Sequence, residues 1–402
     1  MRTRFRPGMN RTKEIVSGCN RRRAPLPLAA ALVLALGLGL SGAPNAAAET
    51  WRLEAWERML DYSSPSHRLD HQPLDTAARP WRLCALYPHL KDSYWLSVNA
   101  GMVEQARRLG VALTVKEAGG YDHAEGQREQ LRECAEGRAD AIILGSVSAN
   151  LHTPAVVEVG RRIPVLATVN RVRPEGVVAM AGVDWYRMGY LTGRFLAERH
   201  PKGSPTVRAA LFPGPPVDGG SAGKMRGFTD ALRDAAVEIA AVRHGDTGKL
   251  VQLSLIEDVL EEDPSIDYIV GAGVAAEAAV GALRARGLQG RIHVVADYFT
   301  HGVYRGIKRG HILAAPTDQP LLQGRISIDQ AVRVLEGLPV PKHVGPEVIL
   351  VTQDSIDGID LAASLSPPDF KPTFGVPAPG TAADGAADDR DPNRHLRPNR
   401  HL

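Results

Sequence analysis

Short apolar runs alternate with amphipathic stretches along most of the chain, from about residue 81 to residue 351. The apolar runs are rich in β-branched residues and have the length of buried strands, whereas the longer stretches carry the spacing of a helix. Strands that alternate with helices predict an α/β fold with parallel sheets covered on both faces. Strands are predicted at residues 83–87, 112–115, 141–144, 165–169, 177–182, 207–212, 239–242, 268–270, 292–296, 312–315 and 348–351. Helices are predicted at residues 96–109, 127–136, 188–198, 225–235, 250–261 and 275–286.

This many strands favours two doubly wound lobes of about 140 residues each over one large sheet. We assign residues 81–184 with 297–320 to the first lobe, and residues 185–296 with 321–365 to the second. Residues 49–80 are mixed and polar and are predicted to form an N-terminal extension.

The two ends of the chain differ in composition from this region. After Leu365 the sequence becomes rich in Pro, Ala, Gly and Asp, and it closes with a repeated five-residue segment. Such a sequence buries too little apolar surface to offset its ordering entropy, so residues 371–402 are predicted to be a disordered tail.

Residues 1–48 have the pattern of a secretory signal peptide. Basic residues precede an apolar run at 26–40, and three alanines follow at 46–48. The run is shorter than the roughly 18 residues that span a bilayer, so cleavage is favoured over an uncleaved anchor. Either general secretion or twin-arginine export is compatible with the basic residues. We therefore expect a protein exported to the periplasm and soluble there.

The charge of the chain changes once this segment is set aside. The 402 residues hold 48 basic and 45 acidic side chains, of which eight basic and one acidic lie in residues 1–48. The remaining 40 basic and 44 acidic side chains leave no excess of positive charge, which argues against a nucleic-acid partner.

Two cysteines, Cys84 and Cys134, lie outside the predicted signal peptide. An even pair in an oxidising compartment predicts a disulfide, with two buried thiols as the alternative. A loop of this length contributes roughly 4 kcal/mol by chain entropy. Neither reading makes these cysteines catalytic, because their spacing matches no redox or zinc motif.

Ligands of open parallel sheets bind in the crevice beyond the carboxyl ends of the strands. Aromatic residues are only 5% of the chain, yet they recur in the loops that follow these strands. Aromatic faces that converge on one crevice suit a small apolar or cationic ligand, and a quaternary ammonium group best, because each face attracts a cation. The residues in question are Tyr94, Trp95, Tyr121, Trp185 and Tyr298.

Several motifs resemble one family of periplasmic binding proteins. The segments LCALYP at 83–88 and LKDSYWLS at 90–97 are similar to the TorT family, which serves trimethylamine N-oxide (TMAO) respiration. The likeness extends over about residues 81–370. Further matching segments lie at 117–121, 188–190, 275–279, 303–306, 308–310 and 364–367.

The resemblance implies a type I, ribose-binding-like fold, with two α/β lobes joined by three hinge crossings and closing on the ligand. It implies TMAO as the ligand, held by the five aromatic residues, and a TorS-like membrane sensor histidine kinase as the partner. Asp92, Asp184 and Asp297 are included in the expected ligand site. A carboxylate at 184 or 297 would favour a cationic methylammonium over zwitterionic TMAO, so both ligands stay open.

The amine-oxide oxygen requires a hydrogen-bond donor, since a buried acceptor without one costs roughly 1–3 kcal/mol. The expected donors are a Tyr hydroxyl or the indole N–H of Trp95 or Trp185.

Two motifs imitate cofactor sites. Residues 268–276 combine a strand with G-x-G-x-x-A, and Asp297 follows at the spacing of a dinucleotide fingerprint. An exported protein has no obvious supply of NAD, so no cofactor is expected. Residues 219–224 imitate a phosphate loop, but Met225 stands where the magnesium-binding hydroxyl belongs. No histidine spacing typical of a metal site and no nucleophile elbow is present, so we expect neither a metal nor an enzyme.

The favoured function is therefore a periplasmic receptor that signals to a sensor kinase. The alternative is the substrate-binding protein of an ABC uptake transporter for a sugar or an amine. A nucleotide-dependent oxidoreductase is the third hypothesis.

Overall fold

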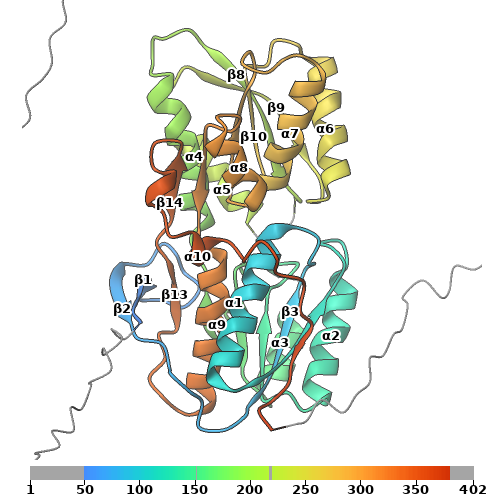
Figure 1. The fold of residues 1–402 in the computed structure, drawn as a ribbon, viewed down its shortest axis with the longest axis vertical. Coiled ribbons are helices and arrows are strands. Elements are labelled where there is room, and N and C mark those ends of the chain that lie inside the picture. The colour runs from blue at the N-terminus through green and yellow to red at the C-terminus, as the bar shows by residue number, and fades with distance from the viewer. Residues whose placement is uncertain (1–48, 151, 217–219, 381–402) are drawn as a thin grey trace, which may run out of the picture. The chain divides into compact units, whose positions relative to one another are not determined.

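The computed structural model describes residues 49–150, 152–216 and 220–380. The predicted signal peptide, residues 218–219 of the phosphate-loop motif and residues 381–402 of the predicted tail lie outside the described residues. The described chain folds into two α/β lobes (Figure 1). None of the described helices combines the length and apolar character needed to cross a membrane.

The first lobe is built on a mainly parallel sheet of nine described strands. Its helices are α1 (Ser93–Leu109), α2 (Ala124–Glu136), α3 (Thr153–Gly160), α9 (Pro320–Leu335) and the short α10 (Leu361–Ser364). The strands run in the order β15 (Gly375–Val376), β4 (Ala112–Glu117), β3 (Arg82–Tyr87), β5 (Ala141–Leu144), β6 (Val165–Thr168), β7 (Val177–Ala181), β13 (His343–Pro346), β1 (Trp51–Trp56) and β2 (Ser66–His71).

The second lobe contains a parallel sheet of four described strands and an antiparallel pair. The sheet order is β11 (His293–Ala296), β10 (Tyr268–Gly271), β8 (Val207–Gly214) and β9 (Val237–His244). The pair is β12 (Ala314–Thr317) with β14 (Ile349–Thr352). The helices are α4 (Trp185–Arg199), α5 (Ser221–Ala231), α6 (Lys249–Glu262), α7 (Gly273–Ala285), α8 (His301–Lys308) and the 3₁₀ turn η1 (Ile356–Gly358).

Every strand predicted from the apolar runs is present, and buried residues from the strands and from the inward faces of the helices form the core. The predicted disulfide between Cys84 and Cys134 is also present, with the two Cα atoms 6.0 Å apart. It connects β3 to α2 inside the first lobe.

The division of residues 297–346 between the lobes was wrong, as was the place of α10, whereas β14 and η1 lie in the second lobe as predicted. Residues 297–320 carry α8 and β12, which pack on α7 and β11 in the second lobe. Residues 320–346 carry α9, packed along α1, and β13, which joins the first sheet beside β7. The reason is that the amphipathic pattern of α9 fits either lobe, and only its long-range packing on α1 decides between them.

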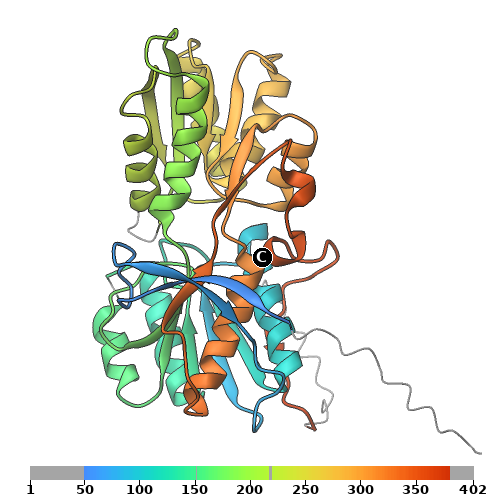
Figure 2. The same ribbon diagram turned by 90° about the vertical axis from the view of Figure 1, so that its left-hand side faces the viewer.

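Two further expectations about the ends need correction. The extension at 49–80 is not separate from the sheet, because β1 and β2 form a hairpin whose β1 pairs with β13 (Figure 2). The predicted disorder also begins too early. Residues 371–380 are ordered against the first lobe, where β15 pairs with β4 and the Asn99 side chain exchanges two hydrogen bonds with the backbone of Thr373.

The N-terminal hairpin also buries a histidine. His343 of β13 is 1% exposed, and its ring lies 4.8 Å from Trp56 and 4.5 Å from Tyr62, measured between ring centres. Its Nδ1 lies 3.1 Å from the carbonyl oxygen of Arg58. Burial, which outweighs the hydrogen bond and the nearby Asp61, lowers the pKa of His343 to about 4.

This histidine gives a pH-dependent term in folding stability. In the unfolded chain a histidine titrates near 6.5, so the unfolded state binds the extra proton first as the pH falls. We expect the His343 contribution, about 2–3 kcal/mol, to be lost between pH 6.5 and pH 4. Urea unfolding at pH 7.0 and pH 4.5 should therefore show a smaller loss in His343→Gln, which does not titrate. An equal loss in both proteins would contradict this assignment.

Candidate functional site

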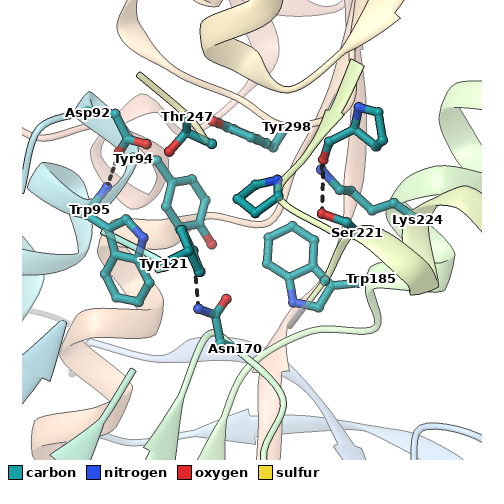
Figure 3. A pocket seen from close by; sticks show the side chains of 13 residues that line it. Asp92, Tyr94, Trp95, Tyr121, Asn170, Trp185, Ser221, Lys224, Thr247 and Tyr298 are labelled. Atoms are coloured by element: carbon teal, nitrogen blue, oxygen red, sulfur yellow. Dashed lines mark hydrogen bonds between the residues drawn. The ribbon is translucent and has the colours of Figure 1, made fainter. Parts of the chain in front are cut away.

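A cavity of about 60 Å³ lies where loops of both lobes meet (Figure 3). From the first lobe, Tyr94 and Trp95 come from the start of α1, Tyr121 follows β4 and Asn170 follows β6. The second lobe supplies Trp185, Ser221 and Lys224 from the starts of α4 and α5, Thr247 from the loop after β9, and Tyr298 from the loop after β11.

All five predicted aromatic residues line this cavity. Tyr94 lies at the centre of the group, with its ring 5.3 Å from Tyr298, 6.0 Å from Trp95 and 6.4 Å from Trp185. Four of the five rings are at most 7% exposed, and Tyr121 is partly exposed. The five aromatic residues thus form a box whose walls belong to different lobes.

The polar ends of the rings are largely engaged with the protein. The Tyr94 hydroxyl donates to Asp318 Oδ2 at 2.6 Å, and the Trp185 indole N–H donates to the Val169 carbonyl at 3.2 Å. Trp185 is therefore not the hydrogen-bond donor to a ligand that the sequence suggested. Tyr121 Oη accepts from Asn170 Nδ2 at 3.2 Å. Burial raises the pKa of Tyr121 to about 12, so its hydroxyl keeps its proton.

The three predicted carboxylates have different places. Asp92 lines the cavity and also caps α1 by accepting from the Trp95 backbone N–H at 3.0 Å. Asp184 caps α4 and lines a separate groove beside β1 and β2, so its assignment to the site is not supported. Asp297 lies just behind the cavity wall, where its Oδ1 is 2.7 Å from Lys224 Nζ. Burial raises the pKa of Asp297, and the Lys224 ammonium opposes this shift.

Lys224 is a charged residue of the cavity wall that the sequence analysis did not assign to the site. It is 5% exposed, lines the cavity and belongs to the glycine-rich segment that imitates a phosphate loop. Its Nζ lies 5.2 Å from the ring centre of Tyr298 and 5.7 Å from that of Trp185. The sequence offered one signal for Lys224 as a site residue, namely a lysine in a glycine-rich loop after a strand. Its burial could not be predicted, however, because it depends on Asp297, which lies far away in sequence.

The other cofactor-like motif has a packing explanation. A Cβ placed on Gly273 would approach the Tyr298 ring to 2.8 Å and the Thr300 methyl group to 2.7 Å. The last glycine of the G-x-G motif therefore makes room for a ring of the aromatic box rather than for a pyrophosphate.

Side chains beside the cavity also connect the two lobes. His89 Nε2 lies 3.1 Å from Thr247 Oγ1, and Lys91 Nζ lies 2.5 Å from Asp246 Oδ2. His89 is 1% exposed, and burial lowers its pKa. Of the charges facing it, Asp92, Asp246 and Glu117 oppose the shift and Lys91 adds to it.

Comparison with known proteins gives the family. Residues 80–365 match the family described as periplasmic binding proteins and sugar binding domain of LacI family. The chain belongs to this family. It is a family of binding proteins rather than enzymes, and the predicted fold and periplasmic location agree with it.

The resemblance to TorT is confirmed. The chain is 41% identical over 298 residues to periplasmic protein TorT of Escherichia coli K12, a match that covers 74% of this chain and 85% of that protein. A solved complex of the TorS sensor domain with TorT in the presence of TMAO is 42% identical, with a TM-score of 0.67. That match covers 73% of this chain and 99% of the solved chain.

A second solved relative is described as a transport protein. It is an ABC transporter solute binding protein from Bradyrhizobium sp. BTAi1 with bound bis-tris, 41% identical with a TM-score of 0.71. The match covers 81% of this chain and 98% of that one.

The buried state of His89 gives a prediction for lobe closure. When the lobes separate, this histidine regains water and an ordinary pKa near 6.5, so protons bind the open form more readily. We expect the closed fraction to fall as the pH drops below about 6.5. Small-angle scattering of the ligand-free protein should give a larger radius of gyration at pH 5.5 than at pH 7.5, and His89→Gln should reduce the difference. A radius that is the same at both values in the wild type would contradict this role.

Proposed function

We propose that this protein is a periplasmic receptor for TMAO that reports its ligand to the sensor domain of a membrane histidine kinase. The observation that carries the proposal is the box of five aromatic residues from two lobes around one small cavity. The proposal includes export by cleavage of the predicted signal peptide at residues 1–48, and it includes no catalytic activity.

The size and lining of the cavity favour TMAO over a sugar. A volume of about 60 Å³ corresponds to roughly four or five water positions, which suits a nitrogen with three methyl groups and one oxygen. Three methyl groups on a positive nitrogen match aromatic faces by cation–π attraction. Sugar sites instead need several directional polar groups that are free to bind the ligand. Here Asp92, Asn170, Ser221 and Thr247, which line the cavity with Lys224, already have hydrogen-bond partners within the protein.

Signalling follows from the position of the ligand between the lobes. A ligand that contacts both lobes binds the closed form better than the open one, and this difference in affinity shifts the population toward closure. The solved TorS–TorT complexes, described with TMAO and without ligand, support a sensor domain as the partner that reads this change.

Uptake remains the alternative because the Bradyrhizobium relative is described as an ABC transporter solute binding protein. The two functions differ in the partner. Co-elution of the protein with the periplasmic domain of a neighbouring sensor kinase supports the receptor, and co-elution with a permease instead would overturn it.

Ligand binding is tested by calorimetric titration of the chain from residue 49 with TMAO, using glycine betaine and ribose as controls. We expect saturable binding of TMAO, weakened about tenfold in Trp185→Ala, because one ring face contributes roughly 0.5–2 kcal/mol, which corresponds to about 2- to 30-fold in affinity. Tyr186→Ala is the matched control, since Tyr186 lies next in α4 but bonds Asp230 and is not among the residues lining the cavity. Heat with ribose and none with TMAO would assign the protein to sugar binding.

A further inference from the structure

Lys224 places a buried positive charge in the wall of a cavity that otherwise suits a cation. Its ammonium carries three hydrogens. Two of them face Asp297 Oδ1 at 2.7 Å and the Pro213 carbonyl oxygen at 3.3 Å. Within the part of the chain that the structure describes, the third has no recorded acceptor, and the side chain lines the cavity. One charged donor is thus left for a ligand.

The position of this ammonium is set by packing of the second lobe. A Cβ on Gly189 of α4 would lie 1.9 Å from the Lys224 carbonyl oxygen, so only glycine lets α5 approach this closely. At the other end, Asp297 follows β11 directly and is 6% exposed. The ion pair therefore spans from α5 to the edge of the sheet and leaves the side chain little freedom to move away from the aromatic box.

The Lys224–Asp297 ion pair sets the charge that a ligand meets in the cavity. Asp297 alone would place an uncompensated carboxylate behind the box and attract any methylated cation. With Lys224 beside Asp297, the ion pair is close to neutral overall. Of the two residues, it is Lys224 that lines the cavity. A cation such as tetramethylammonium meets a like charge there and has nothing to accept the free hydrogen, which lowers its affinity.

An amine oxide can interact favourably with both the aromatic rings and the Lys224 ammonium. Its positive nitrogen and methyl groups face the rings, and its negative oxygen accepts from the ammonium. Hydrogen bonds between charged groups are roughly twice as strong as neutral ones, so this donor outweighs a tyrosine hydroxyl. The Tyr94 hydroxyl and Trp185 indole are in any case committed to Asp318 and Val169.

From this arrangement we infer that Lys224 is the specificity-determining residue of the site, selecting zwitterionic amine oxides over trimethylated and tetramethylated cations. The inference rests on the proposed function, because it assumes that the aromatic box is the ligand site. It assigns the ligand oxygen to the Lys224 side of the cavity, in the second lobe.

The test compares TMAO with tetramethylammonium, which has the same shape but a methyl group in place of the oxygen. We expect the wild type to bind TMAO about 100-fold or more tightly than tetramethylammonium. The double variant K224M/D297N removes both charges and so leaves no buried charge unpaired. It should lose about 10- to 100-fold in TMAO affinity, the range of one charge-assisted hydrogen bond, with little loss for tetramethylammonium.

Two further variants complete the design. Tyr186→Phe removes a hydroxyl that bonds Asp230 and that is not among the groups lining the cavity, so it should leave the preference for TMAO within about threefold of the wild type. Asp297→Asn keeps the ammonium and removes its counter-charge, so it should reject tetramethylammonium more strongly while retaining TMAO. This single variant decides the question if the double variant does not fold.

The outcomes separate the two proposals. A double variant that folds and keeps the wild-type preference overturns the role of Lys224, as does Asp297→Asn that gains affinity for tetramethylammonium. Equal binding of both probes by the wild type also overturns it and leaves the aromatic box intact. A wild type that binds neither probe instead contradicts the proposed function.

Discussion

The hydrogen bond from Tyr94 to Asp318 links the aromatic box to a connection between the lobes. At 2.6 Å it joins a ring of the first lobe to the segment between β12 and α9, where the chain passes from the second lobe to the first. Asp318 also accepts from Gln323 Nε2 at 2.8 Å. Burial raises the pKa of Asp318, and these two hydrogen bonds oppose the shift. The aromatic box is thus anchored directly on a connection between the lobes, so any change in lobe angle moves Tyr94 relative to Trp185 and Tyr298.

The connections between the lobes are more numerous than the resemblance implied. The chain passes between them after β7, after β12 and after β13, which are the three expected crossings. It passes once more between η1, which packs on α8, and α10, which packs on α9. After α10, the Ser366 carbonyl oxygen lies within hydrogen-bond distance of His301 Nε2, and the Ser366 backbone N–H donates to Ser97 Oγ. The described chain thus has four covalent connections between the lobes rather than three.

The parts of the fold that depend on the local pattern of apolar and polar residues were predicted correctly from the sequence. The apolar runs located the parallel strands because a strand buried on both faces must be apolar throughout. The prediction missed four strands that are short, polar or contain Pro and Gly: β1, β2, β13 and β15. These segments become strands only because a partner strand lies beside them. The aromatic box was predictable because strand order brings the carboxyl ends together. Asp184, expected beside it, instead caps α4 and is not among the residues lining the cavity, because a capping carboxylate and a ligand carboxylate look alike in sequence.

Lys224 shows why the remaining part of the site becomes evident only in the folded structure. A lysine is almost never buried unless it is paired, and its partner Asp297 lies 73 residues later, directly after β11. In the sequence the two residues belong to separate motifs, Lys224 to the segment that resembles a phosphate loop and Asp297 to the one that resembles a dinucleotide fingerprint. Together they form a single ion pair, and Gly220 and Gly273, one from each motif, lie close against the Trp185 and Tyr298 rings of the aromatic box. The charge preference of the cavity therefore cannot be predicted from either motif alone. It depends on the short distance between Lys224 and Asp297, which is established only when the second lobe folds.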